Sequence, residues 1–523
     1  MVCFIFNIHF NQPFKAFAMK KSEPSSFTRR QFIRTSAAGA ASVLILPSTG
    51  FKPGTSGKPV KRLLGRTGFE ATTFGLGGQA SIQWTPEGIK PAEIIVRAYR
   101  KGVNYFDTSN LYARSQEHYG EAFRMLGLVP GLPNYSEKAR RSIFLTTKTH
   151  LRWGKGDDTI EGVSNWTGGP QGSHTADDIR RSLTQIFGDG KGYYPPDAWL
   201  DMVLIHSLTT IQEVDALYTG YDNPDPKAER IGALAVLRDF RDGTNRTGLN
   251  PKEEKLIRHI GFSGHYNPAV MMEMIRRDKE NLLDAMLVAI NPNDKLMFNM
   301  QYNVIPVAKA KNMGIIAMKV FADGAMYTKP AHWTQGPHEV VRFARNRELN
   351  PSSLIRYALT TPGVHTAIIG IGQISDNPEE CQIEQNMASA QIAPDGLSES
   401  DRMEIEKMTA RVKDGKTNYF QMEYNGLTPP SSFSVEQENR DGKRLVRVKW
   451  NTAYAGDAPI ASYELWRDGQ KALQIPFVPQ ITNDPFVMEE YLQDREPHKY
   501  FMKTVDARGR EASCDVTVLE GMV

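Results

Sequence analysis

The chain has 523 residues, of which 40% are hydrophobic and 23% are charged, and this balance is typical of a globular protein. The length exceeds that of one ordinary domain, so we expect one large domain with smaller parts. The three cysteines form no C-x-x-C pair, which excludes an iron–sulfur cluster and a cysteine-based zinc site. No internal apolar run reaches about 18 residues, so the sequence predicts no membrane span.

The net charge of +4 comes from the first 50 residues, which carry six Lys or Arg and a single acidic residue. The rest of the chain is close to neutral. A near-neutral body lacks the basic surface that nucleic-acid binding needs, so we expect no nucleic-acid partner.

A charged segment followed by a short apolar run occupies residues 28–46. Arg29 and Arg30 are adjacent in it, and the order is typical of a signal peptide. It resembles a twin-arginine export signal. We therefore expect the first 50 residues to be recognised by the twin-arginine export machinery, which delivers a periplasmic or extracellular protein. Translation from Met19 would leave out residues 1–18.

Short apolar runs alternate with longer amphipathic segments between residues 58 and 408. Continuous apolarity over about five to eight residues is typical of strands buried on both faces of a parallel sheet. Eight such runs predict an α/β fold, a (β/α)8 TIM barrel. A doubly wound sheet is the main alternative, but residues 75–78 lack the third glycine of a dinucleotide fingerprint. The predicted strands are residues 72–76, 103–108, 143–147, 200–206, 257–263, 285–290, 314–321 and 366–371.

The pattern changes after residue 408. Residues 409–427 are largely polar and read as a linker. From residue 428 to 523, apolar and polar residues alternate between turn dipeptides, as around Trp450, which predicts a small all-β, immunoglobulin-like sandwich. The pattern resembles a fibronectin type III domain, with Trp450 and Tyr500 in its core.

Four polar side chains stand at or just beyond the carboxyl ends of successive predicted strands: Asp107, Tyr112, Lys148 and His206. In a barrel they share the rim that carries active sites. Asp107 would hold Lys148 charged, and the Lys148 ammonium would lower the pKa of the Tyr112 phenol from its usual value of about 10. Tyr112 could then protonate a carbonyl that His206 orients.

Several segments carry a family pattern. Residues 102–108 read GVNYFDT, residues 112–115 read YARS, and residues 257–263 read IRHIGFS. On these motifs, residues 61–390 resemble the aldo-keto reductase superfamily. The resemblance implies an oxidoreductase that uses NAD or NADP to reduce a carbonyl or oxidise an alcohol. It also implies that Tyr112 is the general acid of the four-residue set.

The same resemblance indicates where the cofactor binds, and here the chain departs from the family pattern. Gly264 stands in place of an asparagine, Leu287 in place of a glutamine, and Met318 where many members stack a tyrosine on the nicotinamide. No Lys or Arg lies between Arg356 and Arg402, so we expect no strong preference for NADPH. The implied cofactor contacts are Ser263, Gly264, Leu287, Met318, Lys319, Gln385 and Asn386.

The substrate is less well defined by the sequence. Trp84, His150 and Trp153 follow predicted strands one and three, where they could contact a small-molecule carbonyl or sugar-like substrate. Two alternatives remain open at this point. One is a non-catalytic glycan-binding barrel. The other is a metal-dependent hydrolase in which Asp107, His150, His206 and His265 hold the metal.

Overall fold

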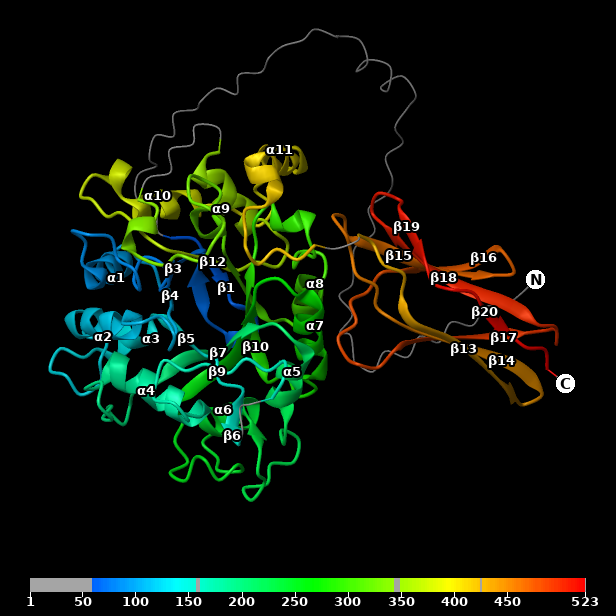
Figure 1. Cartoon of the computed structure of the whole chain (residues 1–523), viewed down its shortest axis with the longest axis horizontal. Coiled ribbons are helices and arrows are strands. Elements are labelled where there is room, and N and C mark those ends of the chain that lie inside the picture. The colour runs from blue at the N-terminus through cyan, green and yellow to red at the C-terminus, as the bar shows by residue number, and fades with distance from the viewer. Residues whose placement is uncertain (1–58, 157–159, 343–348, 424–425, 523) are drawn as a thin grey trace, which may run out of the picture.

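The computed structural model describes residues 59–156, 160–342, 349–423 and 426–522 (Figure 1). The predicted export signal lies outside these residues. Within them, no helix is both long enough and apolar enough to cross a membrane. The described chain forms a large α/β barrel followed by a smaller all-β unit.

Eight parallel strands close into a barrel, which confirms the predicted α/β architecture. Neighbouring strands follow the chain order, and the last pairs with the first through Ala367 and Phe74. Nearly every residue of these strands is buried, as the continuous apolar runs predict. The strands are β3 (Phe74–Gly77), β4 (Tyr105–Asp107), β5 (Phe144–Thr149), β7 (Leu200–Leu208), β9 (Ile257–Gly264), β10 (Leu283–Ala289), β11 (Gly314–Met318) and β12 (Thr366–Ile369).

A short hairpin closes the amino end of the barrel. It consists of β1 (Lys61–Leu63) and β2 (Glu70–Thr72), so Thr72 belongs to this hairpin and not to the first barrel strand as predicted. Leu64 follows β1 and packs into the barrel interior, where rings and aliphatic chains such as Tyr105 fill the space. Only the carboxyl end of the barrel is therefore left open for a ligand.

Helices surround the barrel (Figure 1). In α4 (Thr175–Phe187), Ile179, Leu183 and Ile186 are buried at a spacing of three to four residues, as an amphipathic helix requires. The other helices are α1 (Pro91–Arg100), α2 (Ser115–Met125), α3 (Glu137–Arg141), α5 (Ile211–Tyr218), α6 (Ala233–Asp242), α7 (Pro268–Arg277), α8 (Val304–Ala310), α9 (Pro351–Leu359), α10 (Gln382–Ser389) and α11 (Glu399–Ala410). A small sheet of β6 (Trp153–Lys155) and β8 (Ile231–Gly232) joins two loops at the open end.

The C-terminal unit contains two antiparallel sheets around a separate apolar core that includes Trp450, Tyr463 and Tyr500. One sheet holds β13 (Ser431–Arg440), β14 (Lys443–Asn451) and β17 (Phe486–Leu492). The other holds β15 (Ile460–Arg467), β16 (Gln470–Pro476), β18 (His498–Asp506), β19 (Glu511–Ser513) and β20 (Thr517–Leu519).

Buried hydrogen bonds attach this unit to the barrel beside α8. Asn303 donates to the Ala455 carbonyl oxygen at 3.1 Å and accepts from the Ala455 amide at 2.8 Å. Asn299 donates to the Gly456 carbonyl oxygen at 2.9 Å. Because these polar groups are buried and paired, separating the two units would leave them without partners.

Candidate active site

The four predicted catalytic side chains meet at the open end of the barrel. Lys148 Nζ donates to the two oxygens of Asp107 at 2.7 and 2.5 Å and to the Thr108 carbonyl oxygen at 2.8 Å. The same Nζ lies 4.7 Å from the centroid of the Tyr112 ring. The His206 ring meets the Tyr112 ring edge-on, with centroids 5.6 Å apart. The structure thus brings all four together.

Strand register explains how the ion pair forms. Asp107 of β4 pairs with Thr146 of β5. Lys148 lies two residues beyond Thr146, so its side chain points to the same face of the sheet. Both charged side chains are almost completely buried. Burial raises the pKa of Asp107 and lowers the pKa of Lys148, and each partner opposes the shift of the other.

The expected lowering of the Tyr112 pKa is wrong for this arrangement. Burial raises the pKa of the Tyr112 phenol well above its ordinary value, and the negative charges of Asp107 and Asp323 add to the shift. The Lys148 ammonium bonds directly to Asp107, so its attraction for a Tyr112 phenolate is partly offset by that carboxylate and does not outweigh burial. Tyr112 is therefore protonated at neutral pH, which is the form that a general acid needs.

Three neutral imidazoles surround the phenol. His206 Nδ1 lies 3.3 Å from Ser109 Oγ, and the His150 ring lies 5.6 Å from the His206 ring. Burial, reinforced by Lys148, holds the pKa of His206 well below its ordinary value. Burial also lowers the pKa of His150 to about 2 and strongly lowers the pKa of His265. One nitrogen of each ring contacts a serine hydroxyl: Ser109 for His206, Ser164 for His150 and Ser207 for His265.

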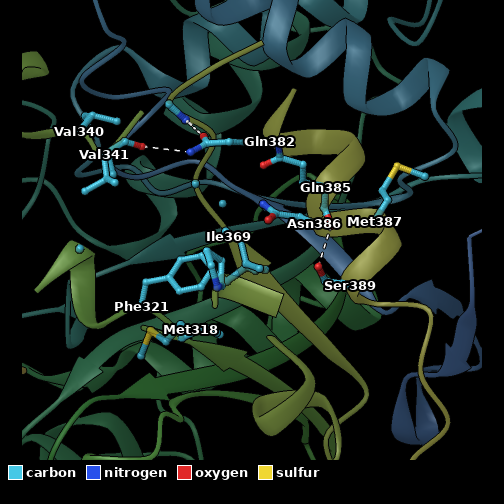
Figure 2. A pocket seen from close by; sticks show the side chains of 18 of the residues that line it. Met318, Phe321, Val340, Val341, Ile369, Gln382, Gln385, Asn386, Met387 and Ser389 are labelled. Atoms are coloured by element: carbon cyan, nitrogen blue, oxygen red, sulfur yellow. Dashed lines mark hydrogen bonds between the residues drawn. The ribbon is translucent and has the colours of Figure 1, made fainter. Parts of the chain in front are cut away.

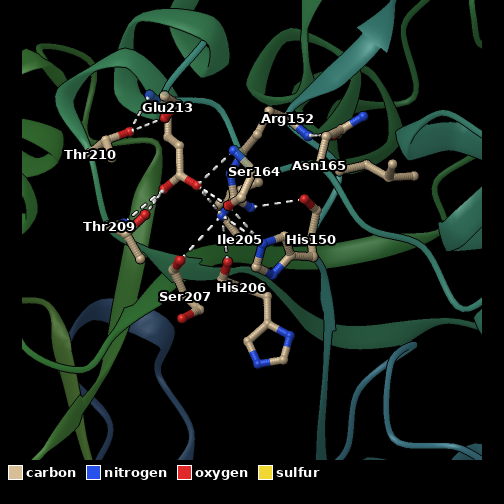
Figure 3. Close-up of polar contacts among 12 residues, drawn as sticks. His150, Arg152, Ser164, Asn165, Ile205, His206, Ser207, Thr209, Thr210 and Glu213 are labelled. Atoms are coloured by element: carbon tan, nitrogen blue, oxygen red, sulfur yellow. Dashed lines mark hydrogen bonds and ion pairs between the residues drawn. The ribbon is translucent and has the colours of Figure 1, made fainter. Parts of the chain in front are cut away.

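The buried side chain of Arg152 contacts the backbone of His206 (Figure 3). Arg152 Nη2 donates to the carbonyl oxygens of His206 at 2.8 Å and Ser207 at 3.2 Å, and Arg152 Nη1 donates to that of His150 at 3.1 Å. Ser207 has φ +55°, a left-handed conformation that is strained for serine. Arg152 therefore fixes the backbone on which two of the three histidines stand.

Glu213 completes this support. Its carboxylate lies 3.3 Å from Arg152 Nη2 and accepts from the Thr209 amide at 2.7 Å. It also accepts from the Ser164 hydroxyl, and Ser164 Oγ lies 3.1 Å from His150 Nε2. Both Arg152 and Glu213 are fully buried. The sequence analysis missed both residues, because only the fold brings the β5 loop against α5.

One cavity of about 1510 Å³ is lined by Tyr112 and by residues of α10. Figure 2 shows the α10 side of this cavity. This volume exceeds that of an ordinary small-molecule pocket, so it has room for a dinucleotide and a substrate. The side chain of Asn386 is buried, and we find no hydrogen bond from it to any other described residue. The donors and acceptors at this end fit a polar nucleotide. Five predicted cofactor residues line the cavity: Leu287, Met318, Lys319, Gln385 and Asn386.

The other two predicted cofactor residues have roles inside the barrel. Ser263 Oγ accepts from the Ser207 amide at 2.8 Å, so its hydroxyl stabilises the loop after β7. Gly264 leaves room for the Met271 side chain, which a Cβ atom would displace. Neither residue lines the cavity. The sequence motif is therefore present, but its atoms are engaged with neighbouring protein groups.

None of the three predicted substrate residues lines the cavity. His150 lies beside His206, with the ring centroids 5.6 Å apart. Trp153 is buried with its ring 6.0 Å from the Arg230 guanidinium, and Trp84 is half-buried in the loop after β3. Neither tryptophan lines the cavity. Their aromatic surface packs loops in this structure.

Gln382 ties the two sides of the cavity together at its far end (Figure 2). Its Oε1 accepts from the amides of Gly372 at 2.6 Å and Gln373 at 3.1 Å. Its Nε2 donates to the carbonyl oxygens of Val341 at 3.3 Å and Arg342 at 2.9 Å. This amide thereby links the loop after β12 to the segment that precedes α9.

The segment read as a polar linker contributes to the barrel mouth. The Phe420 ring stacks on the His265 ring with centroids 4.0 Å apart, and Trp333 lies 6.0 Å from Tyr419. An adjacent pair of aromatic residues in an otherwise polar stretch was the signal that could have indicated this packing. Across the described ranges, no group of three His, Cys, Asp or Glu is arranged to hold a metal ion. The hydrolase alternative therefore lacks a site in these residues.

Residues 73–408 match the family model described as the aldo/keto reductase family. The chain belongs to the aldo/keto reductase family. That family consists of NAD(P)-dependent oxidoreductases, and the chain is an enzyme of this kind that takes NAD(P) as its cofactor.

The chain is also similar to individual proteins. The uncharacterized oxidoreductase YqkF of Bacillus subtilis is 24% identical over 342 residues, which cover 62% of this chain and 90% of YqkF. Aldo-keto reductase AKR11C1 of Bacillus halodurans, in its holo form, is 16% identical over 67% of this chain and 96% of its own, with a TM-score of 0.39. An aldo-keto reductase of Klebsiella pneumoniae in complex with NADPH is 18% identical over 67% and 95%, with a TM-score of 0.39.

The lowered histidine pKa values predict a flat pH profile. Since His206, His150 and His265 stay neutral down to well below their ordinary pKa of about 6.5, kcat for carbonyl reduction should show no ionisation step between about pH 6 and pH 8. In the unfolded chain these three histidines bind protons near their ordinary pKa of about 6.5, but in the folded chain they stay neutral. The free energy of unfolding should therefore fall as the pH drops below about 6.5. A step in kcat near pH 6.5 would mean that a catalytic histidine changes charge there.

The hydrogen bonds from Arg152 to the backbone of His206 predict that a change at Arg152 displaces His206 and lowers kcat. Arg152→Met removes the donors that hold the His150, His206 and Ser207 carbonyls, and a small misplacement of reacting groups can cost about 100-fold in rate. We expect kcat to fall by about 10- to 100-fold while the dissociation constant for the nucleotide stays within about twofold. Arg141→Met, an exposed change on α3, is the matched control. An unchanged kcat in Arg152→Met would show that His206 needs no such support.

Proposed function

We propose that this enzyme interconverts a carbonyl and an alcohol on a carbohydrate-derived substrate, outside the cytoplasm. The observation that carries the carbonyl chemistry is the Asp107–Lys148 pair against the Tyr112 ring, at the mouth of a cavity large enough for a dinucleotide. The NAD(P) nicotinamide, when bound, supplies or accepts the hydride. Each remaining task falls to side chains of this chain.

In the reducing direction, Tyr112 donates its proton to the carbonyl oxygen as the carbon accepts the hydride. The phenolate left behind is stabilised by the Lys148 ammonium 4.7 Å from the ring centroid. Asp107 keeps that ammonium in place through two hydrogen bonds. His206, neutral and beside Tyr112, orients the carbonyl oxygen by a hydrogen bond.

Polar and aromatic groups near Tyr112 support a sugar-like substrate. Among the histidines His150, His206 and His265, His265 lines the cavity, and its neutral ring can bond a hydroxyl group. The Phe420 ring stacks on His265, so an aromatic surface lies next to the cavity wall. The second candidate, a glycan-binding barrel without catalysis, keeps the aromatic contacts but gives the buried ion pair no task.

The residues at the α10 end of the cavity bear on the choice between NADH and NADPH. The segment between Arg356 and Arg402 holds no Lys or Arg. The bases that line this part of the cavity come from elsewhere in the chain, and one of them, Lys101, already pairs with Glu384 at 2.9 Å. We therefore propose that the enzyme has no strong preference for NADPH over NADH.

The strand pattern of the C-terminal unit supports a fibronectin type III-like domain.

Residues 28–46 alone support export by the twin-arginine route. Because this route carries folded proteins, the cofactor would be loaded before export and recycled in place between two substrates. Replacing both Arg29 and Arg30 by Lys should keep the protein in the cytoplasmic fraction. Continued export of that variant would contradict the proposal.

The proton donor gives the main test of the function. Purified residues 51–523, carrying Tyr112→Phe, should lose reduction of a generic aldehyde by about 100- to 10,000-fold, because the ring loses its transferable proton. Titration with NADH and NADPH, followed by quenching of tryptophan fluorescence, should give dissociation constants within about twofold of the native values. The exposed Tyr193→Phe is the matched control and should leave turnover unchanged.

Two results would contradict the proposal. Full turnover by the Tyr112→Phe variant would show that Tyr112 is not the general acid. If the native protein binds neither nucleotide at about millimolar concentration, the oxidoreductase function is contradicted and the glycan-binding function becomes the better proposal.

A further inference from the structure

Lys319 is a cation at the barrel mouth that the catalytic set does not use. It directly follows β11, and its φ of +57° places it in the left-handed region, which is unusual for lysine. Its ammonium lies 3.3 Å from Gln79 Oε1 across the mouth. Lys319 also lines the same cavity as Tyr112. The backbone thus adopts a strained conformation at the residue that presents this charge to the ligand space.

Three aromatic rings enclose the Lys319 ammonium. Its Nζ lies 5.0 Å from the Trp333 ring centroid, 5.6 Å from that of Phe420 and 5.8 Å from that of Tyr419. Such rings attract a cation and keep water away, but they do not neutralise it. We call Lys319 with these three rings the lysine cage.

The two carboxylates whose charges act on Lys319, Asp323 and Asp294, bond to other groups, and one buried oxygen of Asp294 has no hydrogen-bond partner among the described residues. Asp323 bonds to Lys329 at 3.0 Å and to the Thr334 hydroxyl at 3.0 Å. Asp294 accepts from Asn291 at 2.7 Å and from Asn418 at 3.2 Å. Among the described residues, no carboxylate comes within ion-pair distance of Lys319. Lys319 is half-buried, so part of its hydration is lost without an anionic partner in return, and a bound anion would offset that loss.

The lysine cage lies on the substrate side of the mouth. Phe420 stacks on His265, and His265 Nδ1 lies 3.1 Å from the hydroxyl of Ser207, the neighbour of His206. The cage is therefore joined by direct contacts to the residues around the reacting carbonyl. The predicted cofactor residues Gln385 and Asn386, by contrast, lie on α10.

We propose that Lys319 binds an acidic group of the substrate, so that the enzyme acts on carbonyl compounds that carry a carboxylate. This inference rests on the proposed carbonyl chemistry and adds the charge class of its substrate. The carboxylate accepts from the Lys319 ammonium, which lines the cavity, while the rings of Trp333 and Phe420 hold the lysine side chain in place. The same ammonium could instead contact a phosphate of the dinucleotide, and the experiment separates these two sources.

The cage depends on the segment that joins the barrel to the C-terminal unit. Asn293 donates to the Thr417 hydroxyl at 3.1 Å, which places the residues just before Tyr419. The Phe298 amide donates to the Met422 carbonyl oxygen at 3.0 Å, and the Phe298 ring lies 5.2 Å from Tyr454 of the C-terminal unit. Phe298 therefore links the C-terminal unit to the segment that carries Tyr419 and Phe420.

The test compares 4-oxobutanoate with its neutral methyl ester, using the full mature chain loaded with nucleotide. Because a hydrogen bond to a charged group contributes about 1.5 to 3 kcal/mol, Lys319→Met should lower kcat/KM for the acid by about 10- to 100-fold. The loss of kcat/KM for the ester should be at least about fivefold smaller than the loss for the acid, and the nucleotide dissociation constants should change by clearly less than about tenfold. Lys319→Arg should recover part of the loss, and the exposed Lys138→Met is the matched control.

Two outcomes overturn the proposal. Equal losses for the acid and the ester would show that Lys319 does not read the carboxylate. A nucleotide dissociation constant raised about tenfold, with the preference for the acid retained, would assign Lys319 to the cofactor phosphates.

A second measurement keeps the proposal separate from the proposed function. Calorimetry with succinate needs no turnover. If the native protein reduces neither aldehyde but binds succinate, and Lys319→Met does not, the acid site stands while the proposed function fails. Equal succinate binding by both proteins, or binding by neither, overturns the acid site.

Discussion

Two opposite charges, those of Asp107 and Lys148, are held out of water at the mouth of the barrel with 2.5 to 2.7 Å between their atoms. Either charge alone would cost several kcal/mol to bury. Together with the Thr108 carbonyl oxygen, they satisfy most of each other's hydrogen-bonding capacity. The pair also fixes the ammonium against the face of Tyr112, so the geometry of the proton donor depends on it.

The remainder of the barrel can be understood as support for this pair. Below it, Tyr105 and other apolar side chains fill the interior and keep water out. Beside it, Arg152 and Glu213 hold the strained backbone at Ser207 that carries His206. Above it, the chain between the two domains brings Phe420 onto His265. The C-terminal unit contacts the barrel beside α8 through Asn303.

The sequence predicted the features that depend on local pattern. Buried strands appear as continuous apolar runs, and a polar residue that ends such a run, like Asp107 or His206, faces the open end of a barrel. It could not predict contacts made between distant segments. Arg152 and Glu213 are 61 positions apart along the chain, and Phe420 reaches His265 from a stretch that reads as a linker. Ser263 fits a family motif, yet its hydroxyl is already bonded to the Ser207 amide.

The measurement that tests the central claim most directly is a double-mutant cycle on the buried ion pair, read as the free energy of unfolding of the barrel in urea. The account predicts that Asp107→Asn and Lys148→Met each destabilise the protein by about 3 to 5 kcal/mol, because each leaves its partner unpaired. The double variant should lose clearly less than the sum of the two. Additive losses would contradict the account, because they would mean that the two charges do not depend on each other.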